Sequence, residues 1–149
     1  MISSEPALRA VLTQAQFELA QTAAEVAQAA TLSALAQQRV SVLMERCESA
    51  ASELRGVVRR SLINPALLQA MHRLYQAEQH ELHDWQTRLD AAQQREELAR
   101  AELASIRNRE RSLERALQAE RRKQQQKRQT LDLIRADDLW LHRMWTEAS

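Results

Sequence analysis

The sequence predicts an all-α protein, a long antiparallel two-helix coiled-coil hairpin with arms of unequal length. Three observations lead to this class. Ala, Leu, Glu, Gln and Arg dominate the 149 residues, and all of them favour helices. The chain has one glycine, two prolines and only 3% aromatic residues, and its β-branched residues are scarce. Two unbroken series of mostly apolar or small residues, spaced alternately by three and four, flank a single central turn signal.

The two series predict the seam along which the helices pack. The first contains many small residues, which allow a partner helix to approach closely: Leu8, Leu12, Ala15, Leu19, Thr22, Val26, Ala29, Ser33, Ala36, Val40, Leu43, Cys47, Ala50, Leu54, Val57 and Ser61. The second is bulkier: Leu68, Met71, Tyr75, Glu78, Leu82, Trp85, Leu89, Ala92, Glu96, Ala99, Leu103, Ile106, Glu110, Leu113 and Leu117. Large residues against small ones suit an interdigitated seam, and we expect the three glutamates to bend outward to water.

The turn lies at Asn64-Pro65. Proline suits the first position of a helix, and asparagine just before it is a favoured N-cap. Ser4-Glu5-Pro6 gives a similar helix start. We therefore predict one domain over residues 1–149, with a helix over about 5–61, a turn at 62–64 and a helix over about 65–146. One long bent helix in a parallel dimer is the alternative.

Arms of roughly 85 and 120 Å leave the second helix without an intramolecular partner beyond about residue 120. Residue i then lies opposite a position near 126 − i. Three polar residues, Glu120, Gln124 and Lys127, continue the second series, and an apolar stripe follows them. We predict that this end binds a partner through Arg121, Arg122, Lys127, Arg128, Leu131, Ile134, Trp140, Leu141 and Trp145. Back-folding of this segment, packing on a second copy and fraying remain alternatives.

Charge and hydropathy exclude several classes of protein. The net charge is +1, from 21 basic and 20 acidic residues, so we do not expect a dedicated nucleic-acid binder, although residues 121–128 keep that alternative open. No apolar run of about 18 residues is present, so we expect no membrane insertion. An amphipathic membrane helix over 131–145 is disfavoured by Asp132, Asp137 and Asp138. The first residues lack a secretory signal pattern, so we expect a cytoplasmic protein or one exported without a cleavable signal.

The residues that carry chemistry do not form a convincing active site. His80, His83 and Asp84 have the spacing of a metal site, but they lie off the seam and no other ligand is placed near them. Cys47 lies on the seam and is expected to be a small buried residue. A two-helix hairpin encloses almost no volume, so we expect neither an enzyme nor a cofactor.

The stretch "WQTRLDAA", residues 85–92, together with Ile63-Asn64 near the turn, resembles the FliJ/YscO family of stalk proteins. These proteins serve flagellar and virulence type III secretion systems. The resemblance implies a non-enzymatic central stalk whose terminal end enters a hexameric export ATPase and whose turn end faces an export gate protein. It also implies a location in the cytoplasm, peripheral to the secretion apparatus at the inner membrane, and export chaperones as further partners.

On this resemblance, the residues expected near the gate are Leu62, Leu67, Met71 and Tyr75. The residues after Glu120 would form the end that the ATPase holds. The alternative is a coiled-coil chaperone or scaffold that binds other partners along its length.

Overall fold

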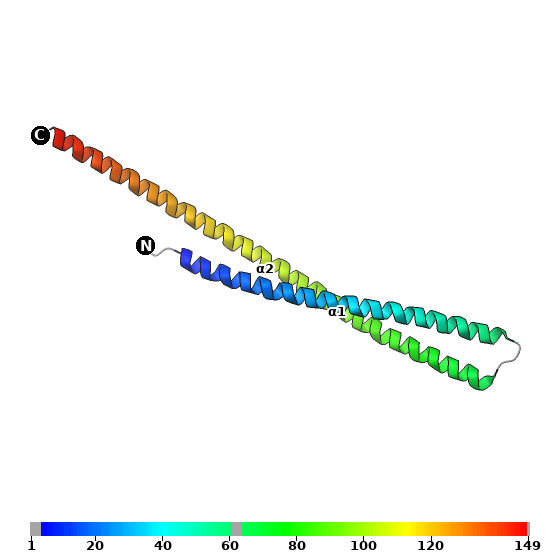
Figure 1. The fold of residues 1–149 in the computed structure, drawn as a ribbon. Coiled ribbons are helices and arrows are strands. Elements are labelled where there is room, and N and C mark those ends of the chain that lie inside the picture. The colour runs from blue at the N-terminus through cyan, green and yellow to red at the C-terminus, as the bar shows by residue number, and fades with distance from the viewer. Residues whose placement is uncertain (1–3, 61–63, 149) are drawn as a thin grey trace. The chain divides into compact units, whose positions relative to one another are not determined.

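The computed structural model describes residues 4–60 and 64–148, and over these residues every element is a helix. Helix α1 spans Glu5–Arg59 and helix α2 spans Pro65–Glu147 (Figure 1). With 55 and 83 residues the helices are as unequal as predicted. They pack against each other in antiparallel directions, which confirms the all-α hairpin class.

The contacts between residues group the chain into two compact units, each built from both helices. The terminal unit comprises Met1–Ala20 and Ala104–Ser149, and the central unit comprises Gln21–Leu103. The sequence predicts a single continuous domain, because the 3-4 spacing gives no signal of a subdivision.

The helix starts follow from capping. The backbone N–H of Ala66 donates to Oδ1 of Asn64 at 3.0 Å, and Leu68 N–H donates to the Asn64 carbonyl at 3.0 Å. Asn64 is therefore the N-cap of α2, with Pro65 in the first position as predicted. At the start of α1, Leu8 N–H donates to the Ser4 carbonyl at 3.0 Å. Helix α1 ends two residues before the expected boundary, and Arg60 N–H donates to the Val57 carbonyl in a tighter last turn.

Replacing Asn64 with alanine should lower the free energy of unfolding by about 1 kcal/mol, because the first turn of α2 loses its side-chain acceptor. Chemical denaturation followed by circular dichroism measures this loss. The matched control is Gln69→Ala, an exposed change inside the same helix. An equal stability for both variants would show that the cap does not contribute.

The predicted seam is the interior of both units. All predicted seam positions of both series are buried or half-buried, except Ser61, which lies outside the described residues. In the central unit Ala36, Val40 and Leu89 form a buried cluster against which Leu82 and Trp85 pack. In the terminal unit the buried apolar residues are Ala15, Ile106 and Leu117.

Ion pairs across the seam report the alignment of the helices. In the terminal unit Glu18 pairs with Arg109, and Oε1 of Glu5 lies 3.3 Å from Nε of Arg121. Both pairs agree with a register in which residue i lies near 126 − i. In the central unit Arg39 and Glu81 are 2.8 Å apart, and Glu81 lies six residues from position 87, which this register places opposite Arg39. Among the residues that the structure describes, no helix contains an apolar stretch of sufficient length to cross a bilayer.

Candidate partner-binding site

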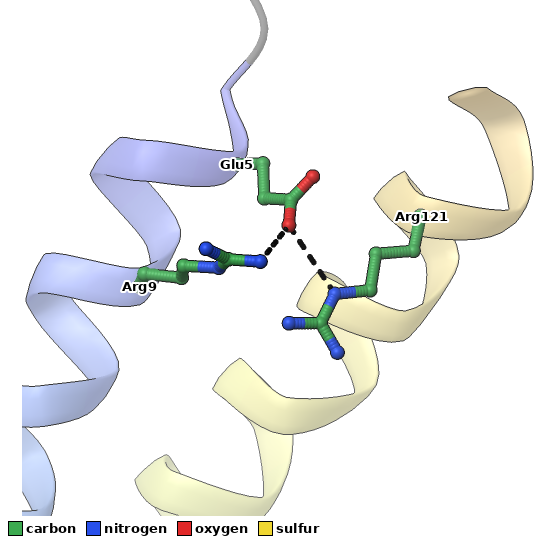
Figure 2. A network of polar contacts seen from close by, with 3 residues as sticks. All are labelled: Glu5, Arg9 and Arg121. Atoms are coloured by element: carbon green, nitrogen blue, oxygen red, sulfur yellow. Dashed lines mark hydrogen bonds and ion pairs between the residues drawn. The ribbon is translucent and has the colours of Figure 1, made fainter.

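The candidate site is the tail, which we define as residues 121–147 at the end of α2 in the terminal unit. Figure 2 shows where it begins: Glu5 lies between Arg9 on its own helix and Arg121 on α2. Gln124 is the last half-buried residue of α2, and all residues from 125 to 148 are exposed. The predicted end of the seam near residue 120 is therefore confirmed to within about one helical turn.

The tail exposes large apolar side chains, and clusters of such side chains on a protein surface usually mark an interaction site. All five apolar residues expected from the sequence are exposed: Leu131 52%, Ile134 51%, Trp140 61%, Leu141 47% and Trp145 77%. Three further residues were missed: Leu133 67%, Leu139 64% and Met144 49%. They lie beside the seam positions rather than on them, so the 3-4 spacing did not select them, whereas hydropathy alone would have done so.

The basic residues of the expected site lie just before the apolar ones. Arg121, Arg122, Lys127 and Arg128 are exposed, and no acidic residue lies between positions 121 and 131. A shallow surface groove lined by Lys123, Gln126, Lys127, Thr130 and Leu131 joins the basic cluster to the start of the apolar surface. The tail therefore offers positive charge and apolar area side by side.

The residues expected near the gate lie at the other end of α2, in the central unit. Leu62 lies outside the described residues. Leu67 is 50% exposed, whereas Met71 and Tyr75 are half-buried in the seam, and the Tyr75 hydroxyl accepts a hydrogen bond from Nε2 of Gln79 at 2.7 Å. A shallow groove beside them has apolar lining from Leu54, Val58 and Leu68, together with Gln69, His72, Arg73 and Gln76. The spacing of apolar residues does not predict this groove, because its lining comes from both α1 and α2 and depends on how the two helices pack.

The residues that carry the family resemblance have packing roles in the structure. Trp85 packs against the buried cluster of the central unit, and the guanidinium of Arg88 lies 4.8 Å from the centroid of its ring. Leu89 is buried and Asp90 is exposed. Packing therefore accounts for Trp85, Arg88 and Leu89, so these residues by themselves identify no binding surface.

Cys47 and Glu78 face the same part of the central seam. Cys47 is buried, and burial raises the pKa of its thiol above the ordinary 9.0, with further increases from the carboxylates of Glu78 and Glu81. The thiol is therefore protonated and unreactive at neutral pH. Because the folded pKa exceeds the unfolded one, this group stabilises the fold below about pH 9 and loses that contribution as pH rises through the folded pKa.

The expectation that the seam glutamates bend to water is wrong for Glu78, whose Oε2 is buried and accepts no hydrogen bond. Glu96 instead pairs with Arg100 at 2.5 Å. Glu96 has an arginine, Arg100, four residues further along α2. The residue four positions after Glu78 is Leu82, which cannot pair with a carboxylate.

The histidine cluster makes only a surface contact. Nε2 of His80 lies 3.8 Å from Oδ2 of Asp84, and both side chains are exposed. Among the described residues, no group of three or more His, Cys, Asp or Glu side chains is placed to hold a metal ion.

Comparisons of the chain with protein-family models, with curated proteins and with solved structures find no match.

Proposed function

We propose that this protein is a non-enzymatic central stalk of a type III secretion export ATPase. In this role the tail engages the ATPase hexamer, and the turn end of the central unit faces the export gate protein at the inner membrane. Export chaperones are a further class of partner. The proposal rests on the resemblance of residues 85–92 to the FliJ/YscO family and on one structural observation, the exposed tail.

The exposed tail is the observation that carries the proposal. Within the terminal unit α1 covers α2 only as far as Gln124, and the exposed residues beyond it include Trp140 and Trp145. Large aromatic side chains are the usual anchors of protein interfaces. A segment that served only to extend the coiled coil would need no apolar residues after its partner helix ends.

The cross-section of each unit also supports a stalk. Two packed helices are about 20 Å across. The outer positions are mostly polar, and ion pairs such as Arg39–Glu81 join the helices. A narrow and stiff body with a polar surface is suited to a position inside a ring of subunits.

The test is a chain truncated after Gln126, assayed for pull-down of the secretion ATPase of the same organism and for stimulation of its ATP hydrolysis. We expect both to be lost, because the truncation removes every large apolar residue of the tail. The matched control is Leu98→Ser, which removes an apolar side chain of α2 that is 73% exposed in the central unit. Binding and stimulation that survive truncation would remove the tail from the mechanism.

A chaperone or scaffold is the second candidate. Two large apolar residues of α1 in the central unit, Leu32 at 46% and Leu35 at 57%, are exposed on the outer surface. Leu32 lines a small depression with Arg88 and Arg95 of α2. Partner binding that survives truncation after Gln126 but is lost on Leu32→Ser/Leu35→Ser would favour this function.

A further inference from the structure

The apolar stripe of the tail continues the seam of the terminal unit in the same phase. Alternate steps of three and four from Ile106 and Leu117, the buried seam residues of α2, lead to Leu131, Ile134, Leu141 and Trp145. The stripe therefore lies on the face of α2 that contacts α1 earlier in the same unit. A surface with this spacing fits the side chains of another helix.

One edge of this stripe carries a column of basic residues at a spacing of seven. Arg121, Arg128, Arg135 and His142 each follow a seam position by one residue, so they lie along the same edge of the helix. Arg121 shows what this edge recognises, because its Nε lies 3.3 Å from the carboxylate of Glu5 on α1 (Figure 2). Arg128 and Arg135 are exposed.

The opposite edge of the stripe is mixed, since its flanking positions are Lys123, Thr130, Asp137 and Met144. Met144 is 49% exposed, and Leu133 and Trp140, which are 67% and 61% exposed, lie on the same side of the helix but further from the seam. A partner is therefore expected to present acidic residues on the side of its own apolar stripe that meets the basic column.

A second copy of the chain fits this surface poorly. In an antiparallel pair of tails the two basic columns would face each other, since flanking positions of the same kind meet across an antiparallel seam. In a parallel pair each Asp138, which occupies a seam position, would face its own copy, and Lys123 would lie near Arg128. Like charges at these places oppose self-association.

We propose that the tail binds an amphipathic α-helix of another protein, one with an apolar 3-4 stripe and a line of acidic residues along one edge. This helix continues the coiled coil of the terminal unit where α1 ends. The seam positions from Gln124 to Trp145 accommodate a helix about 33 Å long. The inference rests on the proposed use of the tail as a partner-binding surface and defines the chemistry of its partner.

The test uses the full-length chain and two synthetic helical peptides of three to four heptads. Both peptides carry leucine at the seam positions, and their flanking positions hold only glutamate in one and only lysine in the other. Fluorescence anisotropy of the labelled peptides gives the affinities. The glutamate peptide should bind roughly tenfold or more tightly than the lysine peptide, because two to four charge pairs are formed instead of repelled.

Three variants identify the surface. Arg128→Glu/Arg135→Glu should reverse the preference, so that the lysine peptide binds more tightly. Ile134→Asp/Leu141→Asp should abolish binding of both peptides. Arg46→Glu/Arg73→Glu has the same change in net charge on exposed residues of the central unit and should leave the preference unchanged.

Several results would overturn this inference. They are equal affinities for the two peptides, no binding of either, or an equal effect of the Arg46/Arg73 variant. A full-length dimer that Ile134→Asp/Leu141→Asp dissociates would also overturn it, because a second copy would then cover the tail. The peptides contain no part of the ATPase, so the inference and the proposed stalk function are tested separately.

Discussion

Replacing Leu43 with alanine is expected to lower the free energy of unfolding by about 2–5 kcal/mol, the range found for leucine removed from a packed interior. Leu43 is fully buried, with 0% of its surface exposed, and it is the largest side chain buried to this degree. Its neighbours on the α1 side of the seam include Val40 and Cys47, which are too small to fill the space that it leaves. The cavity therefore persists in the variant.

Urea denaturation followed by helical circular dichroism measures this loss. The matched control is Met44→Ala at the next position of α1, where the side chain is 54% exposed. Met44→Ala should change stability by a few tenths of a kcal/mol. Comparable losses for the two variants would mean that the seam of the central unit is not packed as described.

Replacing Glu78 with leucine is expected to raise the free energy of unfolding by about 1–3 kcal/mol, because a buried oxygen without a hydrogen bond is removed. Leucine also suits a seam position. The same variant should lower the pKa of the Cys47 thiol, because the Glu78 carboxylate is one of the groups that raise it. Burial is the larger cause, so the pKa should stay above its ordinary value.

Denaturation measures the gain in stability, and the rate of thiol modification as a function of pH measures the shift of the Cys47 pKa. Glu97→Leu is the matched control, an exposed glutamate of the same helix. It should leave both quantities nearly unchanged. A Glu78→Leu variant that is less stable than the parent would show that the carboxylate is solvated in the folded protein.

The helices and their seam were predictable because coiled coils are encoded by local spacing. The 3-4 alternation determines which face of each helix is buried, and the side chain of Asn64 caps the helix that begins at Pro65. The buried face and the helix start therefore depend on local sequence and not on distant contacts. The burial of Oε2 of Glu78 was not predictable, since it depends on side-chain conformations across the seam. The division of the chain into two compact units was not predictable from the 3-4 spacing of apolar residues either.

The candidate site was predictable in position but not in full extent. The sequence located the exposed end of α2, because the shorter helix fixes where its partner surface ends. The seam pattern did not predict the exposed tail residues Leu133, Leu139 and Met144. Near the turn, Leu67 is more exposed than the two seam residues Met71 and Tyr75. The spacing and charges of the tail define the chemistry of its partner, whereas the partner itself supplies the other half of the interface.

The small residues of the α1 seam, Ala15, Ala29, Ser33, Ala36 and Ala50, have a consequence for how the two helices keep their alignment. Small side chains alone would resist sliding only weakly, so the alignment also depends on the large α2 residues that pack against them, such as Trp85 and Leu89. A slip of one heptad, roughly 10 Å, would still place seam positions opposite seam positions, but Glu96, for example, would take the place of Leu89. It would also separate Glu18 from Arg109 and Arg39 from Glu81. These charged contacts therefore help to select one register, and in the terminal unit the Glu18–Arg109 pair thereby fixes how many residues of α2 extend beyond the start of α1.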